Sequence, residues 1–538
     1  MIRRKSSLLT TLLLSAAIFA PVAALAEAPP GMKQEAQADV DSHAKLVQEM
    51  VDSVFSFAEP GFQEYRTQAY LTDILEKNGF KITKGIAGIP TAWTATWGEG
   101  GPLIALGADE DDLLGVSQYP GVPFLEPMVD GAPGHGEGHN TMMPAQIAAA
   151  LAVKAVMEAH HLKGRLLLWP GIAEELLGSK AFFVRDGVFK GVDACIFTHV
   201  ASGFGTSYGP NLRGSGLVSV EYTFHGKTAH AAGDPWDGHS ALAAAELMDM
   251  AWQFQRQFLH ISQRSHDVIS NGGGQPNIVP GIASVWYYYR DYNFKSIRND
   301  WATGDRIAKG VAMATDTTVT EKTLGAAAPQ FGNKILAEVA EANIKAVGMP
   351  KWTAADQAFT KQVQEGLGRP VEPLHTEVSP LRAPQFNGVP TGGPSSDLGD
   401  VTWTVPTITI SEPSNIPNMI GHNATSAIAE ATPIAHKGAV ADAKAIAMTV
   451  LDLMTTPELL AQAKSYFDTD QQKYDHYDPF LTATDVPAIH LNDITMQLMR
   501  PKMEPFYYDA SKYKTYLDQL GISYPYDAAT SRVKPPSK

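Results

Sequence analysis

At residues 134–140 the chain reads Gly134-His135-Gly136-Glu137-Gly138-His139-Asn140, which places a carboxylate and an imidazole two residues apart. The flanking glycines let the backbone turn sharply at little steric cost. An apolar, alanine-rich run begins directly after Asn140, a residue suited to cap a helix N-terminus. The pattern is typical of a metal-binding loop that leads into a helix. The remaining ligands must then come from other parts of the chain.

Predicted strands and helices alternate on both sides of this loop. Short apolar runs predict strands, and longer periodic or alanine-rich runs predict helices. Such alternation indicates an α/β fold, a mixed, mostly parallel sheet with helices on both faces. The predicted strands are Ala92–Trp97 and Leu103–Ala108, joined by a tight turn, then Arg165–Trp169, Val192–Phe197 and Thr407–Ile410; the predicted helices are residues 41–79, Met142–His160, Ala173–Phe183, Lys334–Val347 and Ile434–Met454.

Polar side chains follow these strands. Asp109 and Asp111 come after one strand, Glu174 and Glu175 after the next, and His199 ends the third. Ligands bind at the carboxyl ends of parallel strands, so we expect these side chains near the opening loop. Nitrogen and oxygen ligands suit zinc, manganese or cobalt, and paired metals activate water and polarise a carbonyl. One of the two adjacent glutamates can then bind metal while the other transfers the proton.

Two further histidines are candidate ligands. His135 lies within the opening loop, and His422 lies in the loop Met419-Ile420-Gly421-His422-Asn423. Each candidate alone is weak, because a His-x-Glu-x-His pattern arises by chance and two glutamates at a helix start are favoured by the helix dipole. Their shared position at strand ends is what favours a metal site.

The chain has 538 residues, and changes in its sequence pattern divide it into five parts. We predict a signal peptide over residues 1–26, a catalytic domain in two parts over residues 27–214 and 326–455, and a C-terminal extension over residues 456–538. Between the two catalytic parts, residues 215–325 read as an inserted β-α-β-α domain. Residues 27–40 read as a polar linker. The extension holds nine of the 18 tyrosines, and we expect it to pack on the catalytic domain.

The N-terminus predicts export. Arg3, Arg4 and Lys5 precede the short apolar core Leu8–Phe19, and Ala24-Leu25-Ala26 is a small-x-small cleavage site. The core is shorter than the ~20 residues that a spanning helix needs, so no stable membrane anchor is expected after cleavage. A periplasmic or secreted location follows.

Net charge and cysteine content restrict the possible binding partners and covalent crosslinks. The formal net charge of −15 argues against nucleic acid. The single cysteine, Cys195, excludes an intramolecular disulfide and lies in an apolar run that indicates core packing.

Two other function classes remain open from the residues alone. Gly205-Thr206-Ser207-Tyr208-Gly209 fits the GxSxG pattern of serine hydrolases, with Ser207 as the nucleophile. A true nucleophile elbow opens a helix, whereas polar sequence containing glycine and proline follows here. The other alternative is a non-catalytic exported binding protein on the same fold.

At the level of ordered motifs, the chain resembles the aminoacylase and carboxypeptidase-G-type zinc metallopeptidases. The nearest branch contains the auxin-conjugate amidohydrolases and the B-type subunit of aminobenzoyl-glutamate hydrolase. The resemblance covers about residues 40–460. Its motifs are Asp109–Gln118, Pro133–Asn140, Ala173–Glu175, His199, Gly226–Ala232, Asn277–Pro280, Ser396–Val401 and His422.

The resemblance implies a site for two divalent ions, zinc first, with manganese or cobalt as alternatives. The implied metal ligands are Glu137, His139, Glu175, His199 and His422. Asp109 and Asp111 are implied to contact these ligands without binding the metals themselves. Glu174 is implied as the general base.

The inserted domain is implied to be a lid that joins two copies into a homodimer. His230 on it would steady the oxyanion, often in the partner's site, unless it only caps or lies on the surface. Asn277 and Arg290 match lid positions that hold a substrate carboxylate, although Arg290 could instead pair with an acid on the lid.

The chain departs from this branch at Glu137, where the branch has cysteine. A carboxylate is a harder ligand and shifts the preference towards zinc, manganese or cobalt. A smaller departure is Asp112-Leu113-Leu114 in place of Ala-Leu-Pro. The predicted reaction is hydrolysis of the amide bond of an N-acyl or N-aroyl amino acid or a dipeptide.

Overall fold

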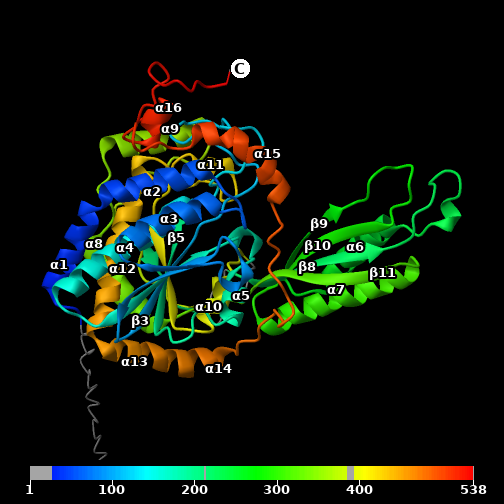
Figure 1. The fold of residues 1–538 in the computed structure, drawn as a ribbon, viewed down its shortest axis with the longest axis horizontal. Coiled ribbons are helices and arrows are strands. Elements are labelled where there is room, and N and C mark those ends of the chain that lie inside the picture. Colours follow the sequence, from blue (N-terminus) through cyan, green and yellow to red (C-terminus); the bar gives the residue numbers. More distant parts are fainter. Residues whose placement is uncertain (1–26, 211–213, 385–392, 537–538) are drawn as a thin grey trace, which may run out of the picture.

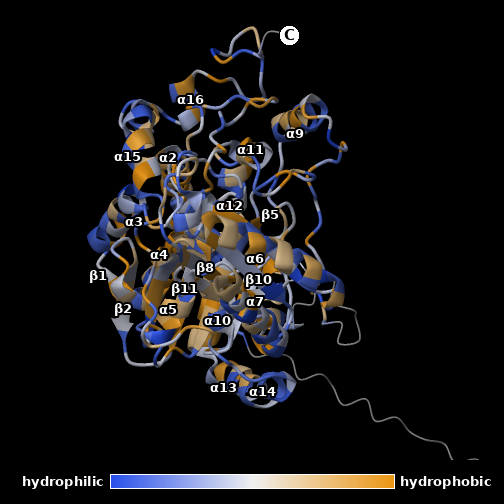
Figure 2. Ribbon diagram, turned by 90° about the vertical axis from the view of Figure 1, so that its right-hand side faces the viewer, coloured by the Kyte–Doolittle hydropathy of each residue, from blue (hydrophilic) through white to orange (hydrophobic). Residues whose placement is uncertain are grey.

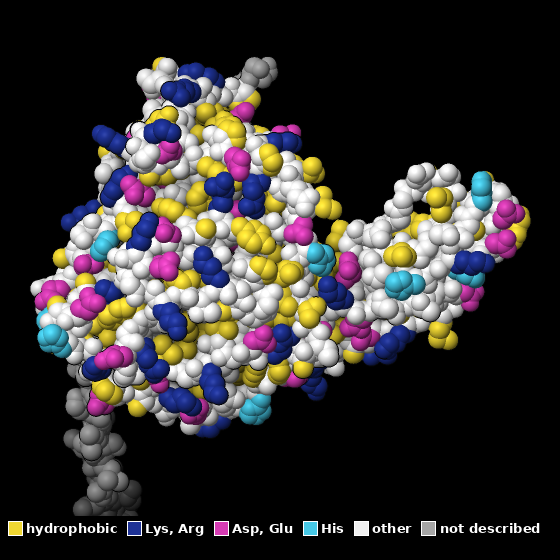
Figure 3. Space-filling view, viewed as in Figure 1, with side chains coloured by type: hydrophobic (Ala, Val, Ile, Leu, Met, Phe, Trp, Pro, Cys, Tyr) yellow, Lys and Arg dark blue, Asp and Glu magenta, His cyan; other side chains and the backbone are white. Residues whose placement is uncertain are grey.

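A computed structural model describes residues 27–210, 214–384 and 393–536. The predicted signal peptide therefore lies outside the described residues. The chain folds into a body and a lid, which projects from the body as a separate arm (Figures 1 and 3).

A seven-stranded sheet forms the centre of the body. Its four central strands are parallel, and antiparallel strands complete both edges. The predicted tight turn between β2 and β3 does not pair them, because β4 lies between them. In spatial order the strands are β1 (Lys81–Lys84), β2 (Trp93–Glu99), β4 (Gly164–Gly171), β3 (Leu103–Asp109), β5 (Ala194–Ala201), β13 (Thr407–Pro413) and β6 (Gly205–Thr206); β7 (Gly209–Pro210) and β12 (Phe331–Gly332) form a separate pair.

Helices cover both faces of this sheet because its strands are apolar on both sides. Ile196 points into the core beneath the long helices, whereas its neighbours Cys195 and Phe197 pack with Trp169 on the opposite face. The predicted α/β class is thereby confirmed, and Cys195 is a buried core residue. The body helices are α1 (Pro30–Ser42), α2 (Ala44–Phe57), α3 (Tyr65–Lys77), α4 (Met142–Ala159), α5 (Lys180–Arg185), α8 (Lys334–Val347), α9 (Ala354–Gly366), α10 (Leu398–Thr402), α11 (Ala424–Ala427) and α12 (Pro433–Thr455).

Helix α4 is largely buried inside the body. Among the described residues, His139–Ala159 is the one helical stretch long and apolar enough to cross a membrane, and 78% of its apolar window is buried. It packs against α1, α12 and the sheet, so it is the core helix of the body.

Two predictions about helical segments of the body are also wrong. Residues 27–40 are not a linker, because most of them form α1, which Lys33 anchors through an ion pair of 2.8 Å between its Nζ and Oδ2 of the buried Asp452. The predicted helix Ala173–Phe183 is interrupted: a tight turn precedes α5, which begins only at Lys180. Tertiary contacts explain both differences, since neither segment has an apolar pattern that settles its conformation.

The lid is a four-stranded antiparallel sheet with two helices on one face. The predicted inserted α+β domain is confirmed, but its order is β-α-β-β-α-β, because strands β9 and β11 were missed. Both contain many polar residues and so lack a clear apolar pattern. The elements are β8 (Gly216–His225), α6 (Ala241–Gln255), β9 (Arg264–Asn271), β10 (Ile282–Asp291), α7 (Phe294–Ala314) and β11 (Thr318–Ala327), with the spatial strand order β11-β8-β10-β9.

The C-terminal extension runs along the body from one end to the other. Helices α13 (Pro457–Tyr466) and α14 (Gln472–Tyr474) lie at the end opposite α15 (Asp493–Met503) and α16 (Tyr516–Leu520) (Figures 1 and 2). Tyr477 donates to Asp400 of the body at 2.7 Å. Arg298 of the lid also donates to Asp478 at 2.6 Å, so the extension contacts both parts of the molecule.

Candidate metal centre and active site

The parallel register of the central strands brings the predicted site together. Asp109 ends β3 opposite Gly171 of β4, and His199 on β5 lies opposite Ser411 of β13. The turn with Glu174 and Glu175 follows β4 directly. Carboxyl ends of parallel strands share one edge of a sheet, so side chains distant in sequence meet there.

Close packing fixes the shape of the opening loop. Gly138 has φ +95°, and a Cβ at this position would lie 2.6 Å from the carboxyl carbon of the buried Glu430. Only glycine fits both restraints. Asn140 does not cap helix α4; its side-chain amide donates to the backbone carbonyls of Val51 and Glu430 at 3.2 and 2.7 Å. These hydrogen bonds therefore attach the loop to α2 and to the loop before α12.

The turn that carries the two glutamates is pinned by a residue that sequence reasoning missed. Ala173 and Leu177, on either side of residues 174–176, have φ values of 54° and 53°, in the left-handed region. Oε1 of the buried Glu64 accepts hydrogen bonds of 3.0 Å from the backbone N–H groups of Phe62 and Ala173. Glu64 is also the first residue before α3, so the sequence signal was that of an ordinary helix start.

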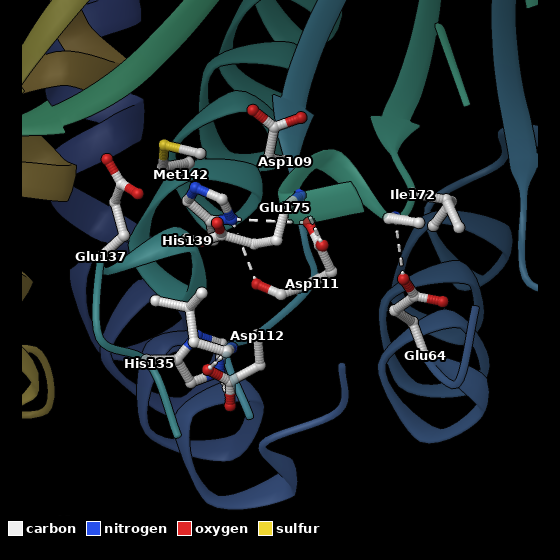
Figure 4. A network of polar contacts seen from close by, with 12 residues as sticks. Glu64, Asp109, Asp111, Asp112, His135, Glu137, His139, Met142, Ile172 and Glu175 are labelled. Carbon is white, nitrogen blue, oxygen red and sulfur yellow. Dashed lines mark hydrogen bonds and ion pairs between the residues drawn. The ribbon is translucent and has the colours of Figure 1, made fainter. Parts of the chain in front are cut away.

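Within the part of the chain that the structure describes, two overlapping groups of side chains could each hold a cation. Ligand atoms of Glu137, His139 and Glu175 all lie within 4.8 Å of one another, as do those of Asp109, His139 and His199. Figure 4 shows His139 between Glu137 and Asp111, with Asp109 close by. By this geometry Asp109 is a candidate ligand as well as a candidate support for the other ligands. Two neighbouring groups that share His139 are consistent with a paired-metal centre.

The imidazoles are oriented as metal ligands require. His139 Nδ1 donates to the backbone carbonyl of Asp111 at 3.1 Å, which leaves its buried Nε2 without a partner. His199 Nδ1 donates to the carbonyl of Val200 at 3.1 Å, which leaves Nε2 as the acceptor. Binding one ring nitrogen to a carbonyl fixes the tautomer and aims the other at a cation. Asp111 also accepts from the backbone N–H of Glu175 at 3.0 Å, so it orients two candidate ligands. The donor set fits divalent ions of the zinc type.

His422 completes the cluster from the loop before α11. Its Nε2 lies 2.7 Å from Oε2 of Glu137 and 3.4 Å from Oε2 of Glu175. Burial acts to raise the pKa of Glu137, but the hydrogen bond from His422 and the neighbouring histidines lower it to about 2. Burial raises the pKa of Glu175 to about 8. Glu137 is therefore ionised and can serve as a carboxylate ligand.

A buried lysine lies beneath the site. Lys180 Nζ is 2.5 Å from Oδ1 of Asp109 and also pairs with Asp397, and all three side chains are fully buried. Burial and Asp109 raise the pKa of Glu174, whereas Lys180 lowers it. Sequence reasoning assigned no role to Lys180, because a lysine in a short helix is usually a surface residue.

The candidate ligands open into a cavity of about 300 Å³. Glu137, Glu174, Glu175, His199 and His422 line it together with Arg290 of the lid. Arg290 Nε is buried and has no hydrogen-bond partner within the protein. This is expected of a donor whose partner is an anionic ligand. Metal ligands, a spare carboxylate and a cation thus meet in one space.

Three predicted residues lie elsewhere. His230 and Asn277 are exposed neighbours near the tip of the lid, where the backbone N–H of Ala231 donates to the Asn277 carbonyl at 3.0 Å. Neither lines the cavity, so both keep their predicted roles only if they act in another subunit's site. His135, the other candidate ligand, is buried against α2, with Nε2 3.1 Å from the Val54 carbonyl.

Ser207 does not have the setting of a serine nucleophile. It is exposed between the short strands β6 and β7 rather than at a strand-to-helix turn. Ser207 lines the metal cavity, but the GxSxG match lacks the geometry of a nucleophile elbow.

Comparison with known proteins agrees with this geometry. Residues 213–304 match the family of peptidase dimerisation domains found in M20 peptidases. A putative aminohydrolase from methicillin-resistant Staphylococcus aureus has the same fold, with a TM-score of 0.54, 18% identity, and coverage of 78% of this chain and 100% of that one. An aminobenzoyl-glutamate utilization protein from Klebsiella pneumoniae gives a TM-score of 0.50, at 17% identity and 76% and 96% coverage.

Curated relatives extend the likeness along most of the chain. The B-type subunit of p-aminobenzoyl-glutamate hydrolase from Escherichia coli is 30% identical over 463 residues, which cover 81% of this chain and 95% of that protein. The mouse Xaa-Arg dipeptidase is 27% identical over 450 residues, with 82% and 93% coverage. With its dimerisation domain and ligand cluster, the chain belongs to the M20 family of metal-dependent amidohydrolases and peptidases.

Proposed function

We propose that this enzyme is exported and cleaves the amide bond of N-acyl or N-aroyl amino acids or of dipeptides. The observation that carries the proposal is the cavity that Glu174, four of the candidate metal ligands and Arg290 line together. A carboxylate-bearing substrate held at Arg290 would place its amide towards the cluster. Two relatives support this class by their names, since one acts on p-aminobenzoyl-glutamate and the other on Xaa-Arg dipeptides.

Different residues would then carry out different parts of the reaction. Glu137, His139, Glu175, His199 and His422 would hold two divalent ions, zinc first or manganese or cobalt, with Asp109 as a further ligand. Such ions lower the pKa of water and polarise the carbonyl. Glu174 would accept the proton of the attacking water and deliver it to the leaving nitrogen. Arg290 would orient the substrate through its carboxylate.

Metal removal tests this proposal. EDTA should lower hydrolysis of N-acyl amino acids at least about 100-fold, because Lewis-acid stabilisation is worth several kcal/mol. Zinc, manganese or cobalt should restore the activity, and a serine-directed reagent should leave it unchanged. Rates are measured across a panel of conjugates together with metal content. Activity that survives complete metal removal would contradict the proposal. A protein that binds none of the three metals would favour the binding-protein alternative.

We further propose that two copies pair through their lids and that His230 acts in the partner's site. The backbone N–H groups of Ala232 and Gly233 donate to His230 Nδ1 at 3.1 and 2.9 Å. Nδ1 is therefore the acceptor, and the proton lies on Nε2, which can donate to a developing oxyanion.

Mixed dimers test this arrangement. We expect His230→Ala and Glu174→Gln each to be nearly inactive as homodimers. After random reassortment, half of the dimers are mixed and each contains one complete site, so about a quarter of wild-type activity should return. The activity of the reassorted mixture is compared with that of unmixed controls. No recovery despite verified mixing would place His230 in its own subunit's site or outside catalysis.

We also propose that residues 1–26 are removed on export to the periplasm or the medium, as their charged start and short apolar core suggest. N-terminal sequencing of protein recovered from those fractions should begin at Glu27. Intact chains found only in the cytoplasm would refute export.

A further inference from the structure

One face of the lid sheet carries an aromatic surface that leads to the cavity. Helices α6 and α7 cover the opposite face, where Tyr287 and Tyr289 of β10 are buried. Side chains alternate along a strand, so Trp286, Tyr288 and Arg290 share the other face. Tyr288 packs beside Leu177, only two residues after Glu175. This face therefore lies against the turn that carries the two glutamates.

The three side chains form a continuous track. The rings of Trp286 and Tyr288 have centroids 5.8 Å apart at an interplanar angle of 74°, and the Arg290 guanidinium lies 5.2 Å from the Tyr288 centroid. Arg290 also lines the metal cavity. Residues two apart on a strand are about 7 Å apart, so the track runs outward from the cavity for about 14 Å.

A hollow of about 210 Å³ lies at the outer part of this track. An apolar cavity of about 150 Å³ is enough to bind benzene, so the hollow has room for one aromatic ring. Trp286 Nε1 donates to Ser219 Oγ at 2.8 Å, which fixes the indole before any ligand arrives. Val268 on the neighbouring strand β9 is 55% exposed and offers apolar surface that a ring would cover. The lining residues are His266, Asp267, Val268, Trp286 and Tyr288.

We propose that this hollow is a subsite for an aromatic ring on the carboxylate-bearing half of the substrate. The inference rests on the proposed function, in which Arg290 holds that carboxylate. The ring would then lie over Tyr288 and reach towards Trp286, where edge-to-face packing is favourable. The enzyme would prefer amides that release phenylalanine, tyrosine or tryptophan over those that release alanine.

Matched substrates test the subsite. Metal-reconstituted wild-type enzyme should cleave N-acetyl-phenylalanine with a higher kcat/KM than N-acetyl-alanine. Trp286→Ala should lower kcat/KM for the phenylalanine conjugate about tenfold or more, and for the alanine conjugate less than about threefold. Trp286→Phe should retain most of the preference. Trp301→Ala is the matched control, because Trp301 lies on α7 and donates to Glu321 at 2.8 Å, away from the hollow.

Three results would overturn the subsite: no wild-type preference, equal losses on both conjugates, or a loss confined to N-benzoyl-alanine, which would place the ring on the acyl half. If no conjugate is cleaved at all, the proposed function fails, and calorimetry with free L-phenylalanine still tests the hollow. Binding that weakens about tenfold in Trp286→Ala but not in Trp301→Ala supports the subsite. Absence of binding to the wild-type protein refutes it.

Discussion

A Glu174→Gln variant is expected to hydrolyse its substrate about 10³-fold more slowly than the wild-type enzyme, because general acid–base catalysis contributes about 10²- to 10⁴-fold. Glu174 lines the cavity and is 6% exposed, and its turn is held by Glu64 and the strained residues around it. Glutamine keeps the shape of the side chain but cannot accept the proton. The fold and the metal content should therefore remain unchanged.

The neighbouring glutamate provides the control. Glu175→Gln removes a candidate ligand from the same turn, so metal content should fall together with kcat. Metal analysis and kcat, measured on both variants, separate the two roles. If Glu174→Gln retains wild-type kcat, another residue transfers the proton. If it loses metal as Glu175→Gln does, Glu174 is a ligand and not the base.

Lys180→Met is expected to lower the free energy of unfolding by about 3–5 kcal/mol, the usual effect of removing one partner from a buried ion pair. Lys180 is the cation between Asp109 and Asp397, and none of the three is exposed. Methionine matches its length but leaves two carboxylates without a countercharge. Urea unfolding of the metal-free proteins measures the change.

The loss should grow with pH. Burial raises the pKa of Asp397 to about 6 even with Lys180 present, and removal of the lysine raises that pKa further. Between the unfolded and folded pKa values the folded state binds more protons than the unfolded state, so stability falls as pH rises. The deficit of Lys180→Met should therefore be larger at pH 8 than at pH 5.

Controls keep this prediction falsifiable. Lys163→Met breaks an exposed pair with Glu99, whose side chains are 68% and 83% exposed, and should change stability by less than about 1 kcal/mol. If Lys180→Met does not fold, Lys180→Met with Asp397→Asn removes one stranded charge and should recover part of the loss. Equal effects of the two lysine variants would mean that the buried pair does not stabilise the fold.

Periodicity and position were enough to predict five of the seven strands of the body sheet, but not the short edge strands β1 and β6. The apolar runs of β3, β4, β5 and β13 are short and uninterrupted, as buried parallel strands require, and a polar residue follows each of the first three. Parallel strands must end at the same edge, so the meeting of Asp109, Glu175 and His199 could be foreseen. The lid strands β9 and β11 could not, because β9 and the first half of β11 carry mostly polar, exposed side chains.

The sequence by itself determined the central strands of the body and the kinds of ligand, because both depend on local patterns and on residue identity. Only the tertiary structure decided which oxygen and nitrogen atoms face one another. It brought Asp109 into the ligand cluster, used Glu64 and Lys180 as internal supports, and left His230 and Asn277 outside their own cavity. These outcomes depend on contacts between residues far apart in the chain, whose geometry follows from how the sheet, helices and lid pack together.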